Sequence, residues 1–225
     1  MAERLNKYLA FHLGLSRREA DNFIADGKVT INGAVATLGD RCKPEDVVEL
    51  NGKPVTKRDN YTYMVLHKPT DYVSSRRHQG DSPTVYDLLP KEYHNLKPVG
   101  RLDRDTSGIL LFTDDGEFAH QMTHPSFVKV KVYEAELDLP LEPLHQQMIS
   151  DHGVRLEDGV SKLGLERFDD DRKHWRITMH EGRNRQIRRT FSSLGYAVVK
   201  LHRTSFGSYQ LNDLPEGKFQ LIKTG

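Results

Sequence analysis

The chain from about residue 60 onward alternates strand-like and helix-like segments without a regular repeat, and this order limits the possible folds more than any other feature. Apolar residues at helical spacing predict three helices, at 117–124, 142–150 and 184–195. Such an order favours an α+β domain at residues 59–225, built on a largely antiparallel mixed sheet. Runs rich in β-branched and aromatic residues predict its strands at 61–69, 108–113, 130–137, 162–168, 174–180, 197–204 and 218–222.

Residues 1–58 are expected to form a separate small domain of two helices and a β-ribbon, which ends in the linker-like stretch "KPVTKRDN". The first helix, "ERLNKYLAFHLG", would end at Gly14, because glycine tolerates the left-handed conformation that terminates helices. Ser16 and Glu19 have the S-x-x-E spacing of a capping box and predict the start of a second helix. The pair Asn32-Gly33 between β-branched residues predicts a tight hairpin.

Composition and the lone cysteine exclude several classes of protein. Hydrophobic residues make up 36% of the 225 residues, which is enough to build packed cores. The longest apolar runs, such as "ILLF" at 109–112, are far shorter than the ~20 residues that span a bilayer. The start of the chain lacks the apolar segment of a secretory signal, so we expect a cytoplasmic protein without a membrane segment. Cys42 is the single cysteine, which excludes an intrachain disulfide and a cysteine-based zinc cluster.

Basic residues are concentrated near the C-terminus, although the formal net charge is only +1. Between Arg172 and Arg203 there are nine lysines or arginines and one acid, Glu181. A clustered basic face is typical of proteins that bind phosphate groups. The alternative is a solvated helix face that is neutralised by acids elsewhere, such as those at 169–171. We favour binding of a polyanion, because the excess falls in one predicted helix and its flanking strands.

No sequence motif points to a cofactor. Neither a glycine-rich dinucleotide loop nor a GxxxxGK[ST] phosphate loop occurs, so nucleotide cofactors are not implied. The histidines lack the spacing of HExxH or of another metal-binding motif, and we expect them to be structural or to face nucleic acid. The histidines concerned are His120, His124, His180 and His202. We therefore expect neither a metal nor a cofactor.

The N-terminal unit has a plausible site for an anion at the start of its second helix. Arg17 and Arg18 lie in the first turn, where free N–H groups and the helix dipole already favour negative charge. Arg4, Lys7 and Lys28 could extend this surface. The stretch "RLNKYLAFHLGLSRREADNFIADGKVTINGAV" resembles the small RNA-binding domain of the S-four ribosomal-protein type, and the resemblance implies binding of structured RNA. A small helical packing module with ordinary surface arginines is the alternative.

The stretch "PVGRLDRDTSGILLFTDDGE" places two acids, Asp103 and Asp105, directly before an apolar strand. A catalytic carboxylate needs a fixed backbone, partial exclusion from water and a nearby cation. Gly100 permits close approach of the chain, and Arg101 and Arg104 supply cations. Spacing alone leaves two other interpretations open. The acids could form and cap a turn, or they could be an Asp-x-Asp pair that holds a metal in a sugar-nucleotide transferase.

The same stretch resembles the signature of the pseudouridine synthases, in particular the branch that modifies ribosomal RNA and carries an S-four-type domain in front. The resemblance implies that Asp103, in "GRLD", is the catalytic aspartate. It also implies an active-site tyrosine at Tyr133 in "KVYEAEL", a basic partner of the aspartate at Arg188 in "EGRNRQIRR", and an apolar pocket residue at Leu201 in "VKLHRTSFG". Arg101, next to the aspartate's motif, is expected to support the site.

The reaction implied by this resemblance is the conversion of uridine to pseudouridine, which needs no metal, redox partner or nucleotide. Asp103 could attack the sugar or the base, or it could remove a sugar proton, and the sequence does not distinguish these routes. Arg188 would hold Asp103 ionised, although it could also contact a phosphate. Tyr133 would replace the stacking that the uridine loses, although an aromatic residue in a strand usually serves packing. Arg185 and Arg189 would face RNA.

The expected function is therefore isomerisation of a uridine in ribosomal RNA by a cytoplasmic monomer. A catalytically silent RNA-binding or ribosome-assembly factor with the same fold is the rival interpretation. The stretches "GVRLEDGVSK" and "EGRNRQIRR" look closer to the enzymes that act on the large ribosomal subunit than to those that act on the small one. The sequence does not indicate which uridine is modified.

Overall fold

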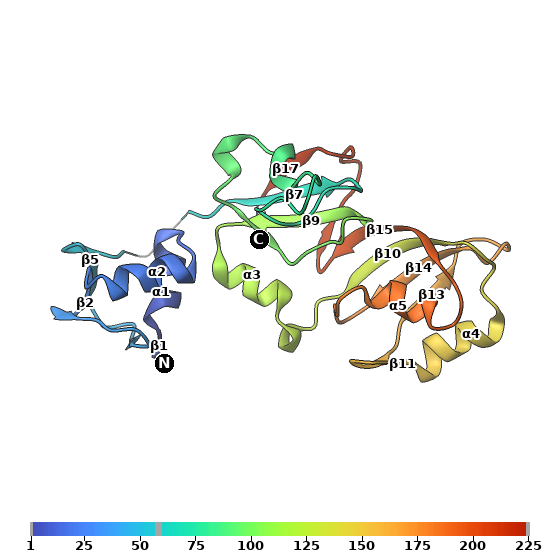
Figure 1. Cartoon of the computed structure of the whole chain (residues 1–225), viewed down its shortest axis with the longest axis horizontal. Coiled ribbons are helices and arrows are strands. Elements are labelled where there is room, and N and C mark those ends of the chain that lie inside the picture. The colour runs from blue at the N-terminus through green and yellow to red at the C-terminus, as the bar shows by residue number, and fades with distance from the viewer. Residues whose placement is uncertain (1, 57–59, 224–225) are drawn as a thin grey trace.

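A computed structural model describes residues 2–56 and 60–223 (Figure 1). The N-terminal part contains two helices, α1 (Leu5–Leu13) and α2 (Arg17–Ala25). Its strands form two small antiparallel sheets, β1-β4 and β3-β2-β5-β6. The strands are β1 (Glu3–Arg4), β2 (Val29–Ile31), β3 (Ala34–Val35), β4 (Arg41–Cys42), β5 (Val48–Leu50) and β6 (Lys53–Pro54).

Local signals explain where the N-terminal helices and the first hairpin begin and end. Gly14 directly follows α1 and, with φ 71°, adopts the left-handed conformation. The Ser16 hydroxyl accepts a hydrogen bond from the Glu19 N–H at 3.1 Å, and the Glu19 carboxylate accepts one from the Ser16 N–H at 2.6 Å. Asn32 and Gly33 both have positive φ, at 51° and 82°, as the tightest hairpin turns require. The predicted helices, capping box and hairpin are confirmed.

The rest of the chain is built on a sheet that has nine strands within the described residues. Its order is β13-β14-β10-β15-β9-β7-β17, with β8 also paired to β9 and β16 to β15. Among the described strands of this sheet, only β15 and β9 run parallel, which confirms the predicted α+β fold with a largely antiparallel mixed sheet. The strands are β7 (Tyr63–Lys68), β8 (Lys97–Val99), β9 (Ser107–Thr113), β10 (Lys131–Leu137), β13 (Gly164–Arg167), β14 (His174–Met179), β15 (Val198–Phe206), β16 (Tyr209–Gln210) and β17 (Phe219–Ile222).

Short helices and one extra hairpin surround this sheet. The hairpin consists of β11 (Val154–Leu156) and β12 (Gly159–Ser161). The α-helices are α3 (Gly116–Thr123), α4 (Pro143–Gln147) and α5 (Gln186–Ser192). A π-helical turn (Met148–His152) continues α4, and 3₁₀ turns occur at Val85–Leu88, Lys91–Tyr93 and Pro125–Phe127. None of these helices, within the part of the chain that the structure describes, is long and apolar enough to cross a membrane.

All predicted strands and helices of this part appear, with shifted ends. The helix expected at 184–195 is shorter than predicted, because Arg185 has φ 45° and lies outside the regular helix as its N-cap. The helix expected at 142–150 changes to π geometry halfway.

Buried apolar side chains form separate clusters in the two parts of the chain. In the N-terminal part, Leu5, Leu9 and Ile24 belong to one cluster. All buried residues of this cluster lie between Leu5 and Val55 in the sequence. In the large sheet, alternate residues of β9 belong to two clusters, because Leu110 and Phe112 face one side and Ile109 and Leu111 face the other. Burial on both faces explains the continuous apolar run of β9. The domain boundary predicted at 58 lies outside the described residues.

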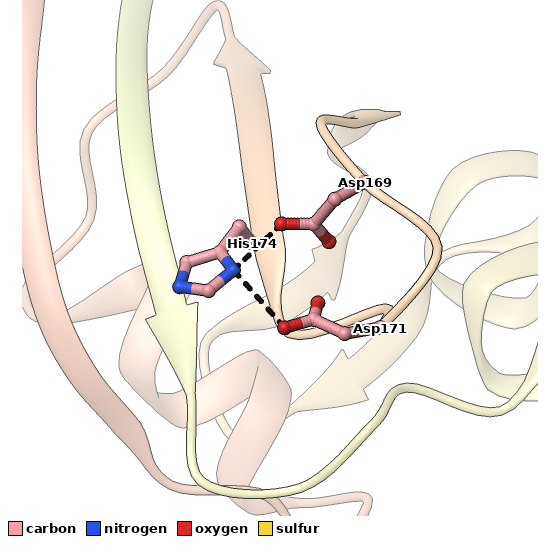
Figure 2. Close-up of side chains that lie close together, drawn as sticks. All are labelled: Asp169, Asp171 and His174. Atoms are coloured by element: carbon pink, nitrogen blue, oxygen red, sulfur yellow. Dashed lines mark hydrogen bonds and ion pairs between the residues drawn. The ribbon is translucent and has the colours of Figure 1, made fainter.

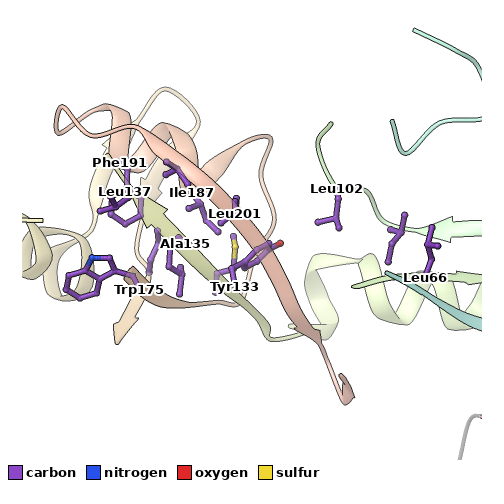
Figure 3. Close-up of a cluster of buried hydrophobic side chains, with 14 of the residues drawn as sticks. Leu66, Leu102, Tyr133, Ala135, Leu137, Trp175, Ile187, Phe191 and Leu201 are labelled. Atoms are coloured by element: carbon purple, nitrogen blue, oxygen red, sulfur yellow. The ribbon is translucent and has the colours of Figure 1, made fainter. Parts of the chain in front are cut away.

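The largest cluster connects strands that carry site residues to helix α5. Figure 3 shows Tyr133, Ala135 and Leu137 of β10 with Ile187 and Phe191 of α5, and with Leu201 of β15. These strands and the helix are therefore held in one position relative to each other.

Candidate active site

The loop between β8 and β9, residues 100–106, carries both acids of the "GRLDRDTSG" motif, and hydrogen bonds to its backbone hold it in place. The Ser74 hydroxyl donates to the Leu102 carbonyl at 2.8 Å and accepts from the Leu102 N–H at 3.2 Å. The Asp71 N–H donates to the Arg104 carbonyl at 2.8 Å. The acids therefore stand on a backbone that its neighbours fix, as a reacting carboxylate requires.

Lys68 supports the same loop, and sequence reasoning missed it. Its side chain is fully buried at the end of β7, and its ammonium donates to the carbonyls of Pro69 and Thr106, both at 2.8 Å, and of Arg104 at 3.4 Å. Burial lowers the pKa of Lys68 to about 8, against the attraction of Asp105 and other acids. The available signal was a lysine that closes an otherwise apolar strand, since a charge there must find partners inside the fold.

Asp105 attaches the loop to the start of α5. The two Nη atoms of Arg185 donate to its two carboxylate oxygens, both at 2.9 Å. The Arg188 Nε lies 3.2 Å from Asp105 Oδ2, and the Arg188 Nη2 donates to the Asp105 carbonyl at 2.7 Å. The hydrogen bonds from Arg185, and to a smaller degree the charge of Arg188, lower the pKa of Asp105 although burial opposes them. Asp105 is therefore an ionised anchor.

Asp103 is held less tightly than Asp105. Its Oδ2 lies 3.7 Å from Nη1 of Arg185, and 34% of its side chain is exposed. Among the described residues, the expected ion pair between Asp103 and Arg188 is absent. The reason is that Arg188 donates to the carbonyls of Val198, at 2.6 Å, and of Asp105, which fixes its guanidinium beside residue 105. The cation that contacts Asp103 is Arg185, which was predicted to face RNA.

A cavity of about 780 Å³ opens beside Asp103. Tyr133 and Leu201 line it from β10 and β15, and both side chains are largely buried. Arg188 lines it from α5, and the exposed Arg101 lies at the same cavity. The structure thus brings together all the residues predicted for the active site, from four separate parts of the sequence. Their roles remain predictions.

The basic residues predicted to bind RNA differ in how far the fold already neutralises them. Arg189 forms a forked contact with Asp158, at 3.1 and 2.7 Å. Lys28 pairs with Asp26 at 2.8 Å. The alternative interpretation named the acids at 169–171 as partners of the basic helix, but Arg185 pairs with Asp105 and Arg189 with Asp158 instead.

The N-terminal arginines are the members of that predicted set that make no ion pair among the described residues. Arg4, Arg17 and Arg18 are exposed, and none makes an ion pair with another described residue. Lys7 lies 3.8 Å from Glu3 and 3.5 Å from Glu117, the latter in α3. Within the set predicted to bind RNA, the unpaired arginines of the described residues therefore all lie in the N-terminal part, where Arg17 and Arg18 begin α2.

A cluster with metal-ligand side chains lies in the turn between β13 and β14, outside the cavity. Figure 2 shows the His174 ring beside two carboxylates, with Nδ1 2.8 Å from Asp169 Oδ2 and 3.4 Å from Asp171 Oδ2. Both acids are exposed, and the imidazole already serves as their partner. This arrangement is explained as a surface ion-pair network that closes the turn.

Two family models match the chain. The model described as RNA pseudouridylate synthase matches residues 62–193, which include the cavity's Asp103, Tyr133 and Arg188. The S4 domain model matches residues 3–48, which include both N-terminal helices.

Individual proteins are similar over nearly the whole chain. A protein named ribosomal large subunit pseudouridine synthase B, from Bacillus subtilis (strain 168), is 38% identical over 96% of this chain and 90% of its own. One named ribosomal small subunit pseudouridine synthase A, from Pasteurella multocida (strain Pm70), is 35% identical over 97% of this chain and 95% of its own. A solved structure titled "Crystal structure of pseudouridylate synthase" superposes with a TM-score of 0.70 at 32% identity, over 98% of this chain and 96% of that one.

Proposed function

The chain belongs to the RNA pseudouridylate synthase family, and we propose that it converts a uridine of large-subunit ribosomal RNA to pseudouridine with Asp103 as the reacting group. In this isomerisation the bond between ribose C1′ and uracil N1 breaks and a bond between C1′ and C5 forms. The C5 proton leaves and N1 gains one, so no co-reactant is consumed. Asp103 either attacks the nucleotide or removes a sugar proton, and both routes use its ionised form.

The contrast between the two acids of the loop is the observation that carries the assignment to Asp103. Asp105 has both carboxylate oxygens bonded by Arg185 and its backbone carbonyl bonded by Arg188. Among the described residues, Asp103 keeps only a 3.7 Å ion pair with Arg185, and it lines the cavity, which Asp105 does not. A carboxylate that must reach a substrate has to be near a cation without being saturated by it.

The remaining cavity residues are proposed to hold the uridine. Tyr133 presents an aromatic ring that can replace the stacking lost when the base leaves its neighbours, on the order of 1 to 3 kcal/mol. Leu201 supplies apolar wall beside it, which excludes water from the reacting bond. Arg188 binds Asp105 and so fixes the loop that carries Asp103. Arg188 does not contact Asp103 itself, so its proposed role is to position the loop.

Ribosomal RNA is the proposed substrate because relatives of this chain are named for it. Both large-subunit and small-subunit names occur among them, and the similarity to the Bacillus subtilis large-subunit protein supports the choice of subunit. The S4 domain and its exposed arginines would contribute phosphate contacts. We propose that the protein acts in the cytoplasm as a monomer, with one cavity formed by one chain.

The test compares full-length Asp103→Asn with the wild type on unmodified transcripts of both ribosomal RNAs. Pseudouridine formation is followed by the release of tritium from C5 of labelled uridines, and the product is then mapped on the transcript. We expect Asp103→Asn to lose activity completely while its affinity for the transcript stays within about twofold of the wild type, because a neutral amide replaces a carboxylate of the same shape. Asp213→Asn changes an exposed aspartate outside the cavity and should keep full activity.

Each alternative gives a different result in this experiment. If Asp103→Asn still forms pseudouridine, another group reacts. If the wild type binds the transcripts and forms no pseudouridine on either, the protein is a silent RNA-binding factor. If product appears on the small-subunit transcript alone, the choice of subunit is wrong. Mapping of ribosomal RNA from cells that lack the protein then identifies the uridine.

A further inference from the structure

Three aromatic side chains from α3 and the segment that follows it lie against one another, and one of them, His124, lines the cavity. The ring centroids of His120 and His124 are 4.7 Å apart, and those of His120 and Phe127 are 5.6 Å apart. The third pair, His124 and Phe127, is at 6.4 Å. All three residues are exposed, with 43% of Phe127 accessible. We call His120, His124 and Phe127 the aromatic ridge.

The residue after the ridge has an unusual backbone. Val128 has φ 37° and ψ 74°, in the left-handed region that β-branched residues avoid, and 57% of it is exposed. The conformation is set by a 3₁₀ turn in which the Val128 N–H donates to the Pro125 carbonyl. His124 and Val128 both line the cavity. A strained residue that projects an apolar side chain at a cavity's edge is typical of a functional contact.

The ridge lies beside the loop that carries the proposed catalytic aspartate. A Cβ atom placed on Gly100 would lie 3.7 Å from the Cγ2 atom of Thr123, which is the residue before His124. Arg101 follows Gly100, is exposed and lines the same cavity, and the half-buried Lys129, which follows Val128 in the chain, lines it as well. The ridge is therefore a group of exposed aromatic residues next to a cavity that Arg101 and Lys129 also line.

We propose that the aromatic ridge stacks on an unpaired nucleobase next to the target uridine. The inference rests on the proposed function, because it requires that a uridine enters the cavity. A uridine that leaves its stack uncovers the faces of its neighbours, and exposed aromatic rings are the usual protein surface for an uncovered base. The cations of Arg101 and Lys129 fit the phosphates next to such a base. The ridge thus recognises RNA whose target lies in a loop or bulge rather than in a continuous helix.

The test uses three substitutions of Phe127 in the full-length protein, on a ribosomal RNA transcript that the wild type binds. Phe127→Ala removes the π face, Phe127→Leu keeps apolar volume without it, and Phe127→Trp enlarges it. Stacking predicts that Phe127→Ala and Phe127→Leu raise KM and the dissociation constant at least about fivefold, whereas Phe127→Trp stays near the wild type. The slope of log Kd against log salt should not change, because stacking releases no counterions.

Phe168→Ala is the matched control, since Phe168 is 46% exposed and lies in the turn after β13, outside the aromatic ridge. The proposal is overturned if Phe127→Ala binds like the wild type or no worse than Phe168→Ala. It is also overturned if Phe127→Leu retains full affinity, which would indicate simple apolar contact, or if the salt slope falls, which would indicate a lost phosphate contact. The dissociation constants are measured without turnover, so they test the ridge even if the wild type proves inactive and the proposed reaction fails.

Discussion

At the scale of single residues, the candidate site separates two acids that look equivalent in the sequence. The loop places Asp105 against two arginines, so that its charge is fully used in holding the loop to α5. Asp103, two residues earlier, is left beside the cavity with one longer ion pair. The charges of both acids act on the buried ammonium of Lys68 and oppose the lowering of its pKa by burial.

Lys68 yields a prediction about stability and pH. Its pKa is about 8 in the fold and near 10.5 in the unfolded chain, so between these values the unfolded state binds more protons. Stability must then rise with pH, by at most about 1.4 kcal/mol per pH unit from this group. Lys68→Met removes this dependence and adds a constant loss, because three carbonyls lose their donor.

The free energy of unfolding is measured in urea for the wild type and for Lys68→Met, from pH 7 to 10. The value for Lys68→Met is then subtracted from the wild-type value at each pH. The difference should be flat up to about pH 8 and then increase in favour of the wild type, because other groups cancel in the subtraction. The exposed Lys91 is the control, and Lys91→Met should give a flat difference throughout. A flat or falling curve for Lys68 would show that its ammonium is not destabilised by burial.

At the scale of elements, the sequence predicted what depends on local patterns and missed what depends on contacts between distant segments. The capping box at Ser16 and the hairpin at Asn32 are short-range signals, and both are confirmed. The fold class followed from the order of strands and helices. The pairing of Arg188 with Asp105 could not be predicted, because it depends on how α5 meets a loop 83 residues away along the chain.

The parallel pairing of β9 and β15 depends on Gly108, which gives a prediction for one element. A Cβ atom on Gly108 would lie 2.2 Å from the Arg203 carbonyl oxygen, and the residue has φ 113°. Gly108→Ala should therefore force the strands apart and cost at least about 2 kcal/mol of folding free energy, together with most activity. Gly217→Ala is the control, because Gly217 also has positive φ but has open space around it, and it should cost about 1 kcal/mol. Urea unfolding of both variants checks this, and equal losses would contradict it.

At the scale of the whole molecule, the N-terminal domain contacts the catalytic part through a small set of interactions. The Lys97 ammonium donates to the Leu15 carbonyl at 2.8 Å, and the rings of Phe11 and Tyr61 are 5.4 Å apart. Figure 1 shows the N-terminal helices on the side of the catalytic part where α3 lies. The start of α2 therefore lies close to Lys97, and RNA bound there could reach both parts of the protein.

The charges around Glu19 support this arrangement. Hydrogen bonds from Ser16 are the main reason that the pKa of Glu19 is lowered, and Lys97 and Arg76 of the catalytic part add to the effect. The exposed Arg17 and Arg18 begin the same helix, so cations from both parts of the chain gather at this junction. Such a gathering of positive charge attracts the phosphates of a bound RNA.

The double substitution Arg17→Gln and Arg18→Gln tests whether the S4 domain supplies phosphate contacts. Each lost contact should reduce the slope of log Kd against log salt by about 0.7 to 0.9, so the double variant should bind the ribosomal RNA transcript more weakly with a slope lower by about 1.4 to 1.8. Its kcat at saturating RNA should stay unchanged, because neither arginine lines the cavity. Lys91→Gln, which also removes an exposed charge, is the control and should leave the slope as it is. An unchanged slope in the double variant would mean that RNA reaches the cavity without contacting the start of α2.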